Sequence, residues 1–452
     1  RIKCGYKDCR RFFRITYIPS AVFDVPISAT VENLNALVNK AICSANGSWS
    51  DKRFELLIGE TFVRSSLAEF IEEYSVETET VLKIECILGK ETPKPLHDIS
   101  APDWISSIAI SSSYLFATTY SGDVIIIDSN GKKVLENQRD KGSALKCSVL
   151  MHKDIGGFRC LLKYSFVNKL EDTSEPKKLE GHQIVSGGEN QILTLYEVES
   201  SAMIPKTVFR GHERSVECVD VNKECSRLVS GDQATVFEKD ADGDQNPKKR
   251  KENFVTKVKF VSCSTERLFR NERNVKQKCQ GVSEAEYYYF IHKDAVVGLR
   301  WCSWNSSQVI SASWDHCIAL WDLQLAGEVS RIRGSKSFTS IDVNKKSGLV
   351  ISSSTDAVPR LYDCRSHDGS LVKQSFIGHT GWVSCVKWSP RDEVCFVSAS
   401  FDKSMKMWDI RSSKTSLFDL HGHDDRVLCC AWGDGVVASG SADSTIKVFS
   451  TP

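Results

Sequence analysis

The chain has 452 residues, of which 41% are hydrophobic and 26% charged, with 59 basic and 58 acidic side chains. This length exceeds one ordinary core and predicts several domains or a repeat array. The net charge of +1 provides no overall field that would favour nucleic acid or a membrane surface. The sequence has neither the run of about 18 apolar residues that a membrane-spanning helix requires nor the apolar core of a secretory signal. We therefore expect an intracellular protein without a membrane partner.

The first part of the chain, residues 11–90, predicts a small α+β domain of the ubiquitin-like β-grasp type, for which about 80 residues suffice. The chain continues through residues 91–102, which we expect to be a linker, and no diglycine ends the domain. It is therefore a docking domain rather than a conjugated modifier. The expected elements are strands at 12–18 and 21–27, a helix that begins after Thr30, a strand at 54–59, a short helix at 66–74 and a closing strand at 81–88.

A repeat recurs in the last part of the chain, and each copy has a Ser, an Asp four residues later, and a large apolar or aromatic residue six residues after that Asp. The turn residues Asp315, Asp356, Asp402 and Asp443 follow one another at intervals of 41 to 46 residues. This period is typical of WD repeats, which form four-stranded propeller blades. We therefore expect residues 103–452 to form a propeller.

Three weaker copies at 115–128, 184–198 and 210–232 bring the expected number of blades to seven. Two stretches, 142–183 and about 238–288, break the period, and we expect the second to be an irregular insertion between blades three and four. The predicted fold class is mainly β, a seven-bladed WD-repeat propeller preceded by an α+β ubiquitin-like domain.

Two repeats carry a full set of the polar and aromatic residues that form a hydrogen-bonded chain in WD blades. Blade seven ends in Phe449 instead of Trp, and blade five has Tyr362 and lacks the His. The complete sets are His379, Ser398, Asp402 and Trp408, and His292, Ser311, Asp315 and Trp321.

The same residue types occur in Ser-His-Asp hydrolases, where the Ser lies exposed on a strained turn beside its base. Ser398 and Ser311 instead lie in mid-strand within a unit that recurs. We therefore expect structural tetrads and no catalytic residues. Cys4 and Cys9 lack a second ligand pair at zinc-finger spacing, so we expect no metal site of the chain's own.

A basic run follows Pro247 in a polar stretch that we expect to be a loop between blades three and four. Such a run is typical of a nuclear import signal or an RNA contact, and the alternative is a plain solvated loop. Its residues are Lys248, Lys249, Arg250 and Lys251.

A β-grasp domain fused to a propeller, the segment 62–85, the Asp103-Trp104 pair and the basic loop together resemble one family. It comprises the WD-repeat ribosome biogenesis proteins that act with Pescadillo and Block-of-proliferation in the PeBoW complex. The resemblance covers nearly the whole chain except the two irregular stretches. It implies a non-enzymatic scaffold, without cofactor or small-molecule substrate, in rRNA processing and maturation of the large (60S) ribosomal subunit. It also implies residence in the nucleus, nucleolus and nucleoplasm, a propeller docked on Block-of-proliferation and Pescadillo, and a possible rRNA contact within the pre-60S particle.

In that family the ubiquitin-like domain binds the MIDAS domain of midasin, a giant AAA ATPase, and a Glu just before the last strand completes the coordination of the MIDAS metal. The matching residue here is Glu79, with Glu77 as its competitor. A hard Mg²⁺ ion with an open position takes a carboxylate oxygen. The plain alternative is that both are solvated acids. The resemblance implies that ATP-driven force on this domain strips the chain from the particle.

Two other classes remain open from the sequence. Notchless is a similar midasin-binding biogenesis factor with eight blades, and the interval from Asp232 to Asp315 is long enough for two repeats. However, the repeat frame is missing between 238 and 288. A substrate receptor of a ubiquitin ligase would need a ligase-docking segment outside the propeller, where this chain has a β-grasp. An enzymatic propeller would need titratable residues at its central channel, which the sequence does not place.

Overall fold

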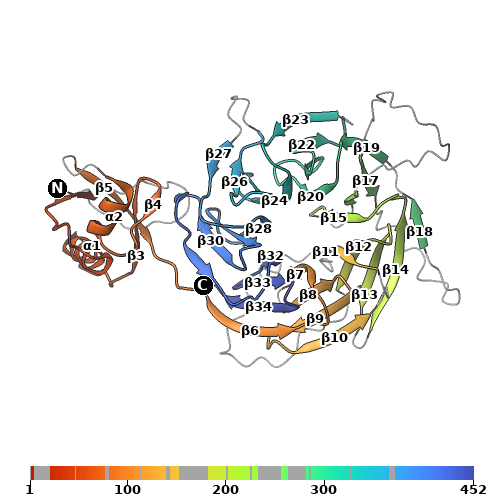
Figure 1. The fold of residues 1–452 in the computed structure, drawn as a ribbon, viewed down its shortest axis with the longest axis horizontal. Helices are drawn as coiled ribbons and strands as arrows, with labels where there is room; N and C mark the ends of the chain where they lie inside the picture. Colours follow the sequence, from red (N-terminus) through yellow and green to blue (C-terminus); the bar gives the residue numbers. More distant parts are fainter. Residues whose placement is uncertain are drawn as a thin grey trace, which may run out of the picture.

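The computed structural model describes residues 2–4, 21–45, 47–76, 81–111, 113–138, 143–151, 182–199, 202–223, 227–232, 256–262, 281–284, 287–325, 327–365 and 372–451. These residues form a small α+β domain beside a ring of seven sheets (Figure 1). The mainly β architecture of a ubiquitin-like domain followed by a seven-bladed propeller is thus confirmed. In the ranges given above, neither helix is long and apolar enough to cross a membrane.

The small domain is one five-stranded sheet in the order β2-β1-β5-β3-β4, covered by two helices. β1 runs parallel to β5 and antiparallel to β2, which is the pairing of a β-grasp. The expected first strand at 12–18 lies outside the described residues, and β1 precedes the expected boundary at residue 11. The elements are β1 (Ile2–Cys4), β2 (Ala21–Phe23), α1 (Val31–Ala45), β3 (Phe54–Ile58), β4 (Thr61–Phe62), α2 (Leu67–Tyr74) and β5 (Leu82–Leu88).

Both helices begin at capping side chains, as the sequence predicts for α1. Thr30 Oγ1 accepts a hydrogen bond from the amide three residues later, at 3.3 Å, and Ser66 does the same for α2, also at 3.3 Å. α2 ends at Tyr74, and the next residue, Ser75, caps it in the left-handed conformation with φ 48°. The apolar faces of both helices pack on Ile84 and Cys86 of the central strand β5. The residues of α1 that are buried there are Leu34, Val38 and Ile42.

The seven blades share one frame, in which the innermost strand faces the central channel and the second strand pairs antiparallel with it. The second strands contain the most deeply buried apolar runs. The innermost strands are β7 (Ile105–Ile110), β11 (Leu145–Met151), β15 (Val216–Val221), β20 (Val296–Trp301), β24 (Phe338–Val343), β28 (Val383–Trp388) and β32 (Val427–Trp432). The second strands are β8 (Tyr114–Thr119), β12 (Gln183–Gly188), β16 (Arg227–Asp232), β21 (Gln308–Ser313), β25 (Val350–Ser354), β29 (Cys395–Ser400) and β33 (Val436–Ser441).

The third and fourth strands complete each blade toward the rim, where β18 (Gly281–Glu284) adds a fifth strand to blade two. The third strands are β9 (Asp123–Asp128), β13 (Leu193–Val198), β17 (Thr256–Ser262), β22 (Cys317–Asp322), β26 (Arg360–Tyr362), β30 (Met405–Asp409) and β34 (Thr445–Ser450). The outer strands are β10 (Lys133–Gln138), β14 (Met203–Arg210), β19 (Tyr287–His292), β23 (Gly327–Arg333), β27 (Val372–Ser375), β31 (Phe418–Leu420) and β6 (Lys94–Ser100).

The outer strand of blade seven comes from the N-terminal side of the propeller and closes the ring. β6 pairs antiparallel with β34, from Lys94 opposite Ser450 to Ser100 opposite Thr445. The structure therefore differs from the linker expected at 91–102, because most of that segment is a strand. Pro95 has no amide hydrogen to donate between strands, and it is tolerated because β6 is the outer strand of its sheet.

Both irregular stretches also contain strands. β11 occupies the start of 142–183 and is the innermost strand of blade two. In the stretch at 238–288, β17 and the beginning of β19 belong to blade three, and β18 extends blade two. The basic run therefore lies within blade three, between β16 and β17, and not between blades three and four. Its residues at 248–251 lie outside the described ranges.

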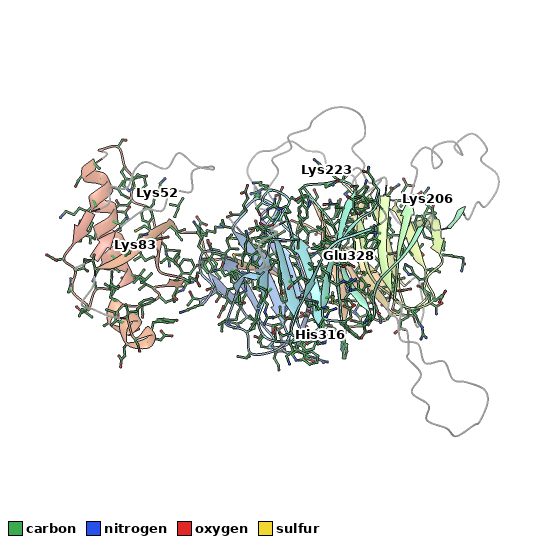
Figure 2. The ribbon with its side chains drawn as sticks, turned by 90° about the horizontal axis from the view of Figure 1, so that it is seen from above. Lys52, Lys83, Lys206, Lys223, His316 and Glu328 are labelled. Atoms are coloured by element: carbon green, nitrogen blue, oxygen red, sulfur yellow. The ribbon has the colours of Figure 1, made fainter. Side chains whose placement is uncertain are left out.

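The ring has two faces that differ in which turns they expose. Each first strand begins, and each second strand ends, on what we call the entry face, as shown by the bond from the amide of Phe401 to the carbonyl of Trp382 at 2.8 Å. His316, in the turn after β21, and Lys223, in the turn after β15, lie on opposite faces of the ring (Figure 2). The ubiquitin-like domain lies at the rim beside blade six (Figures 1 and 2).

Candidate functional site

The blade-six tetrad is joined into one hydrogen-bonded chain across three strands. His379 Nδ1 lies 2.7 Å from Asp402, and its Nε2 lies 2.7 Å from Ser398 Oγ. Trp408 Nε1 donates to the same hydroxyl at 2.8 Å. With the ring hydrogen on Nδ1, His379 donates to the carboxylate and accepts from the serine, so each member has a partner.

The same His, Ser and Asp positions meet in three further blades. In blade four, His292 lies 2.7 Å from Ser311 and 3.0 Å from Asp315. Trp321 of that set packs against the apolar core between blades three and four. The sets in blades seven and three are His423, Ser439 and Asp443, and His212, Ser230 and Asp232. The repeat does not predict Ser230, because the third strand of blade three does not follow at the usual spacing.

The turn carboxylates of blades four, six and seven are stabilised as anions. Burial alone would raise the pKa of Asp315, but hydrogen bonds from His292 and from two backbone amides outweigh burial and lower it to about 2. The pKa of Asp443 is likewise about 2, and that of Asp402 is also lowered, against the effect of burial. In these three blades the carboxylate also accepts from the amide that follows its His, as Thr380 donates to Asp402 at 3.1 Å. The sets therefore fasten the turns of the entry face.

The buried serines cannot act as hydrolase nucleophiles in this state. The exposed fractions of Ser398 and Ser311 are 0% and 1%, so a substrate carbonyl has no route to either hydroxyl. A nucleophilic serine must reach solvent on a turn. The described ranges contain no group of three or more His, Cys, Asp or Glu side chains arranged to hold a metal ion.

In two blades, residues that the repeat does not predict form the hydrogen bonds of this turn. In blade five, Arg360 replaces the His: its guanidinium lies 2.7 Å from Asp356 and 3.1 Å from Ser354 Oγ. In blade one, Asp123 accepts from Ser121 Oγ at 2.5 Å, so the carboxylate stands two residues after the expected position. An Arg four residues after the turn Asp would have been a usable sequence signal in blade five.

The entry face carries a continuous series of aromatic side chains across blades one, seven and six. Arg426 lies 5.5 Å from the ring of Trp104 and 5.3 Å from that of Phe401, so its guanidinium bridges two rings. Trp104 contacts Tyr120 edge to face at 6.2 Å, and Phe401 stacks on Trp382 at 5.8 Å. We call these five residues the aromatic ladder.

The aromatic ladder is open to solvent although it is built of large apolar groups. The exposed fractions of Trp382 and Trp104 are 53% and 43%. Exposed aromatic and arginine side chains held in one arrangement are typical of protein interfaces. Because stacking and the cation–π contacts fix the rings beforehand, a partner would bind a surface that is already ordered.

The expected midasin ligands, Glu79 and Glu77, lie outside the described residues. The flanking elements are described: α2 ends at Tyr74, and β5 begins at Leu82. The acidic segment therefore connects a capped helix to the central strand of the domain sheet. The ring of Tyr74 lies 5.9 Å from Lys414 of blade six, so this end of α2 is next to the propeller.

Comparison with known proteins gives a consistent family. Residues 11–71 match the model of the NLE (NUC135) domain, and residues 203–237, 286–322, 370–409 and 414–450 match the WD domain, G-beta repeat. The chain is 48% identical to the ribosome biogenesis protein WDR12 homolog of Caenorhabditis briggsae, over 96% of this chain and 92% of that protein. It is 38% identical to the protein of that name from Brugia malayi, over 98% and 96%, and 29% identical to that from Aedes aegypti, over 95% and 92%.

Proposed function

The chain belongs to the WDR12 family of ribosome biogenesis proteins, and from this premise we propose that it is a non-enzymatic scaffold of the maturing large ribosomal subunit. Its propeller docks on Block-of-proliferation, itself joined to Pescadillo, and its ubiquitin-like domain offers Glu79 to the MIDAS metal of midasin. Force from that ATPase then releases the chain from the pre-60S particle. The observation that carries the docking part is the aromatic ladder.

The aromatic ladder supports docking of a folded protein surface. Trp and Arg are the residues most often responsible for binding energy at interfaces, where they fill pockets on the partner. The Arg426 guanidinium already lies over the rings of Trp104 and Phe401. Two acidic residues, Asp424 and Asp425, precede it in the turn before β32. A partner with apolar pockets rimmed by basic side chains fits this composition.

The midasin part rests on the position of Glu79 before the closing strand of an NLE-type domain. A carboxylate on a loop between a helix and a strand can supply one oxygen to a Mg²⁺ ion held by another protein. Glu77 has the same chemistry two residues earlier and is the natural comparison.

The site of action we propose is the nucleus, in both nucleolus and nucleoplasm, where the family's substrate particles mature. The basic run at 248–251 serves as a nuclear import signal or as a contact with rRNA. A Notchless-type assignment with eight blades has less support, because strands of blades three and four occupy the interval between Asp232 and Asp315 in the described ranges.

Docking is tested by calorimetry of the full chain with the Block-of-proliferation propeller. We expect Trp382→Ala and Arg426→Ala to weaken binding at least about tenfold, which corresponds to about 1.4 kcal/mol. Trp314→Ala is the matched control, because Trp314 is 41% exposed on the same face but outside the aromatic ladder. Equal affinities for all four proteins would exclude the ladder as the docking site.

The metal bridge is tested with midasin's MIDAS domain and the full chain, with Mg²⁺ and with chelator. We expect binding to be lost in chelator and in Glu79→Ala, and to persist in Glu77→Ala. Binding that survives both chelator and the Glu79 substitution contradicts the proposal. The Glu79→Ala chain should still bind the Block-of-proliferation propeller, because the two sites belong to different domains.

A further inference from the structure

The ubiquitin-like domain is fastened to blade six by the turn between β3 and β4. The partner is the loop between β30 and β31, residues 412–417, which we call the blade-six loop. The backbone carbonyl of Glu60 accepts from the amides of Ser413 at 3.1 Å and Lys414 at 3.4 Å. The carboxylate of Glu60 also accepts from the hydroxyl of Ser413 at 2.6 Å. One hairpin residue thus holds two consecutive residues of the propeller.

The next residues of the hairpin continue the contact. The amide of Phe62 donates to Thr415 Oγ1 at 3.0 Å. Arg64 donates to the carbonyls of Ser416 and Leu417, the latter at 3.1 Å, and its other terminal nitrogen lies 3.1 Å from Glu55. Glu55 thereby orients the guanidinium toward the loop. The hydrogen bonds follow the loop residue by residue, which fixes the orientation of the domain.

Apolar packing seals the same contact. Leu57 and Phe62 are 2% and 1% exposed, although they lie on the strands β3 and β4 at the edge of the small domain. They belong to one buried cluster with Cys395, Leu417 and Leu420 of blade six. Side chains of this size contribute roughly 1.5–3 kcal/mol each when fully buried. The contact therefore combines directional bonds with burial, as stable interfaces do.

The covalent connection between the domains is short and leads into the strand that closes the ring. Only residues 89–93 separate β5 from β6. Within this connector, Lys90 forms an ion pair with Asp392 of blade six and donates to Cys395 Sγ at 2.9 Å. From Pro93 the chain passes directly to Lys94, the first residue of β6.

This connectivity makes the ring vulnerable to pulling. If the connector alone joined the domains, a pull on the ubiquitin-like domain would load β6 at Lys94 and detach its pairs with β34 one after another. Loss of β6 would leave blade seven with an open edge and the ring without its closure. The blade-six loop offers a second path that bypasses β6, because blade six is built entirely from residues of β28 to β31.

We propose that the contact of Glu60, Phe62 and Arg64 with the blade-six loop is a mechanical anchor that carries load from the ubiquitin-like domain into blade six and protects the β6 closure. Its importance for extraction from the particle rests on the function proposed above. The anchor itself is a property of this chain alone. Glu60 and Arg64 are positioning residues that hold the small domain on blade six. They belong neither to the repeat motifs nor to the proposed metal-binding loop.

Single-molecule pulling of the full chain tests the anchor without midasin. Handles are attached at Lys83 of the small domain and at Glu328 on the outer strand of blade four, both exposed and widely separated (Figure 2). Once Lys90 has separated from Asp392, the connector can extend by about 17 Å at about 3.4 Å per residue. Any longer first extension therefore requires loss of structure in the small domain or in the propeller.

In the wild-type chain we expect no early undocking step and a single high-force loss of structure. In Glu60→Ala/Arg64→Ala we expect an early step of up to about 17 Å, followed by loss of propeller structure at lower force. Arg53→Ala is the matched control, because Arg53 directly precedes β3, its side chain is 70% exposed, and its ion pair at 3.9 Å with Glu55 is within the small domain. The control should behave as wild type.

Hydrogen exchange of the same proteins gives a second, force-free readout. The amides of Ser413 and Lys414 should exchange at least about tenfold faster in the double variant, equivalent to about 1.4 kcal/mol, with the amides of blade three unchanged. Ser413→Ala removes the hydrogen bond to the Glu60 carboxylate from the propeller side. It should give a smaller increase in the exchange rate. An early step in the wild type, or a double variant that loses propeller structure at the wild-type force, overturns the anchor. Neither result depends on whether midasin binds Glu79.

Discussion

Ser398 Oγ accepts a hydrogen bond from Nε1 of Trp408 at 2.8 Å, in a blade where both side chains are 0% exposed. The same hydroxyl serves His379. We predict that Ser398→Ala lowers the free energy of unfolding by about 1–3 kcal/mol for each polar group left without a partner. Denaturant unfolding followed by tryptophan fluorescence measures this loss.

Ser186 in blade two supplies the matched control for that change. It occupies the corresponding place in β12, is 2% exposed, and its hydroxyl has no hydrogen-bond partner in the described part of the chain. Ser186→Ala should therefore change stability by less than about 1 kcal/mol, because no bond is broken. Equal losses at Ser186 and Ser398 would mean that the tetrad bonds add nothing to blade stability.

Blade seven should lose stability in acid in two steps. Burial lowers the pKa of His423, and the hydrogen bonds from Thr445, the amide of Asp424 and His423 hold the pKa of Asp443 at about 2 despite burial. In both cases the unfolded chain binds more protons than the folded one, so the free energy of unfolding falls as pH falls. The first decrease begins below about pH 6.5 and the second lies between about pH 4 and 2.

The measurement is urea unfolding at a series of pH values. Asp443→Asn should remove part of the loss between about pH 4 and 2, and His423→Gln should flatten the decrease below about pH 6.5. Asp424→Asn is the control: Asp424 is exposed and adjacent to His423, and the variant should keep the wild-type profile. A profile unchanged by the Asp443 substitution would show that this carboxylate titrates alike in folded and unfolded chains.

The junction between blades seven and one should not tolerate a methyl group at Gly440. A Cβ there would lie 2.5 Å from Cγ2 of Ile105 and 2.9 Å from Sγ of Cys429. We predict that Gly440→Ala lowers the melting temperature, with a cost of about 1–3 kcal/mol for overpacking. In Gly327→Ala the new Cβ would meet nothing nearer than 3.6 Å, so this control should melt as wild type. Indistinguishable melting of the two variants would contradict tight packing at the junction.

The Arg360–Asp356 pair should act as a substitute for the missing histidine of blade five. A double-mutant cycle of Arg360→Ala and Asp356→Asn should give a coupling of about 1–2 kcal/mol, because the hydrogen bonds are charged and half-buried. The surface pair of Arg391 and Asp434, at 2.9 Å and with both side chains exposed, should couple by less than about 1 kcal/mol. A stronger coupling in the surface pair would reverse this assignment.

The sequence predicted those parts of the fold that repeat at fixed spacing. The Ser and Asp positions of blades four to seven follow from a period of 41 to 46 residues, and the helices of the small domain follow from their caps. The third strand of blade three could not be predicted from this period, because residues 233–255 separate it from the second strand. The alternation of Val258 and Phe260 in β17 was the available signal.

The aromatic ladder and the contact with the blade-six loop could not be predicted from the sequence, for a different physical reason. Arg426 meets Trp104 only because the ring closes, and Glu60 meets Ser413 only because the small domain sits on blade six. Neither partner is near the other in sequence, and neither belongs to a repeat motif. The metal-binding proposal for Glu79, by contrast, came from the family resemblance and remains a prediction.

Closure of the ring by β6 also determines when the propeller can finish folding. Lys94 and Ser450, joined at 3.2 Å, are 356 positions apart in the sequence. During synthesis the closing strand leaves the ribosome long before its partner exists, so β6 stays an unpaired edge for most of translation. Contacts of such separation are slow to form and expose the nascent chain to mispairing. This protein should therefore depend on a chaperone that shields β6 until the last blade has been made.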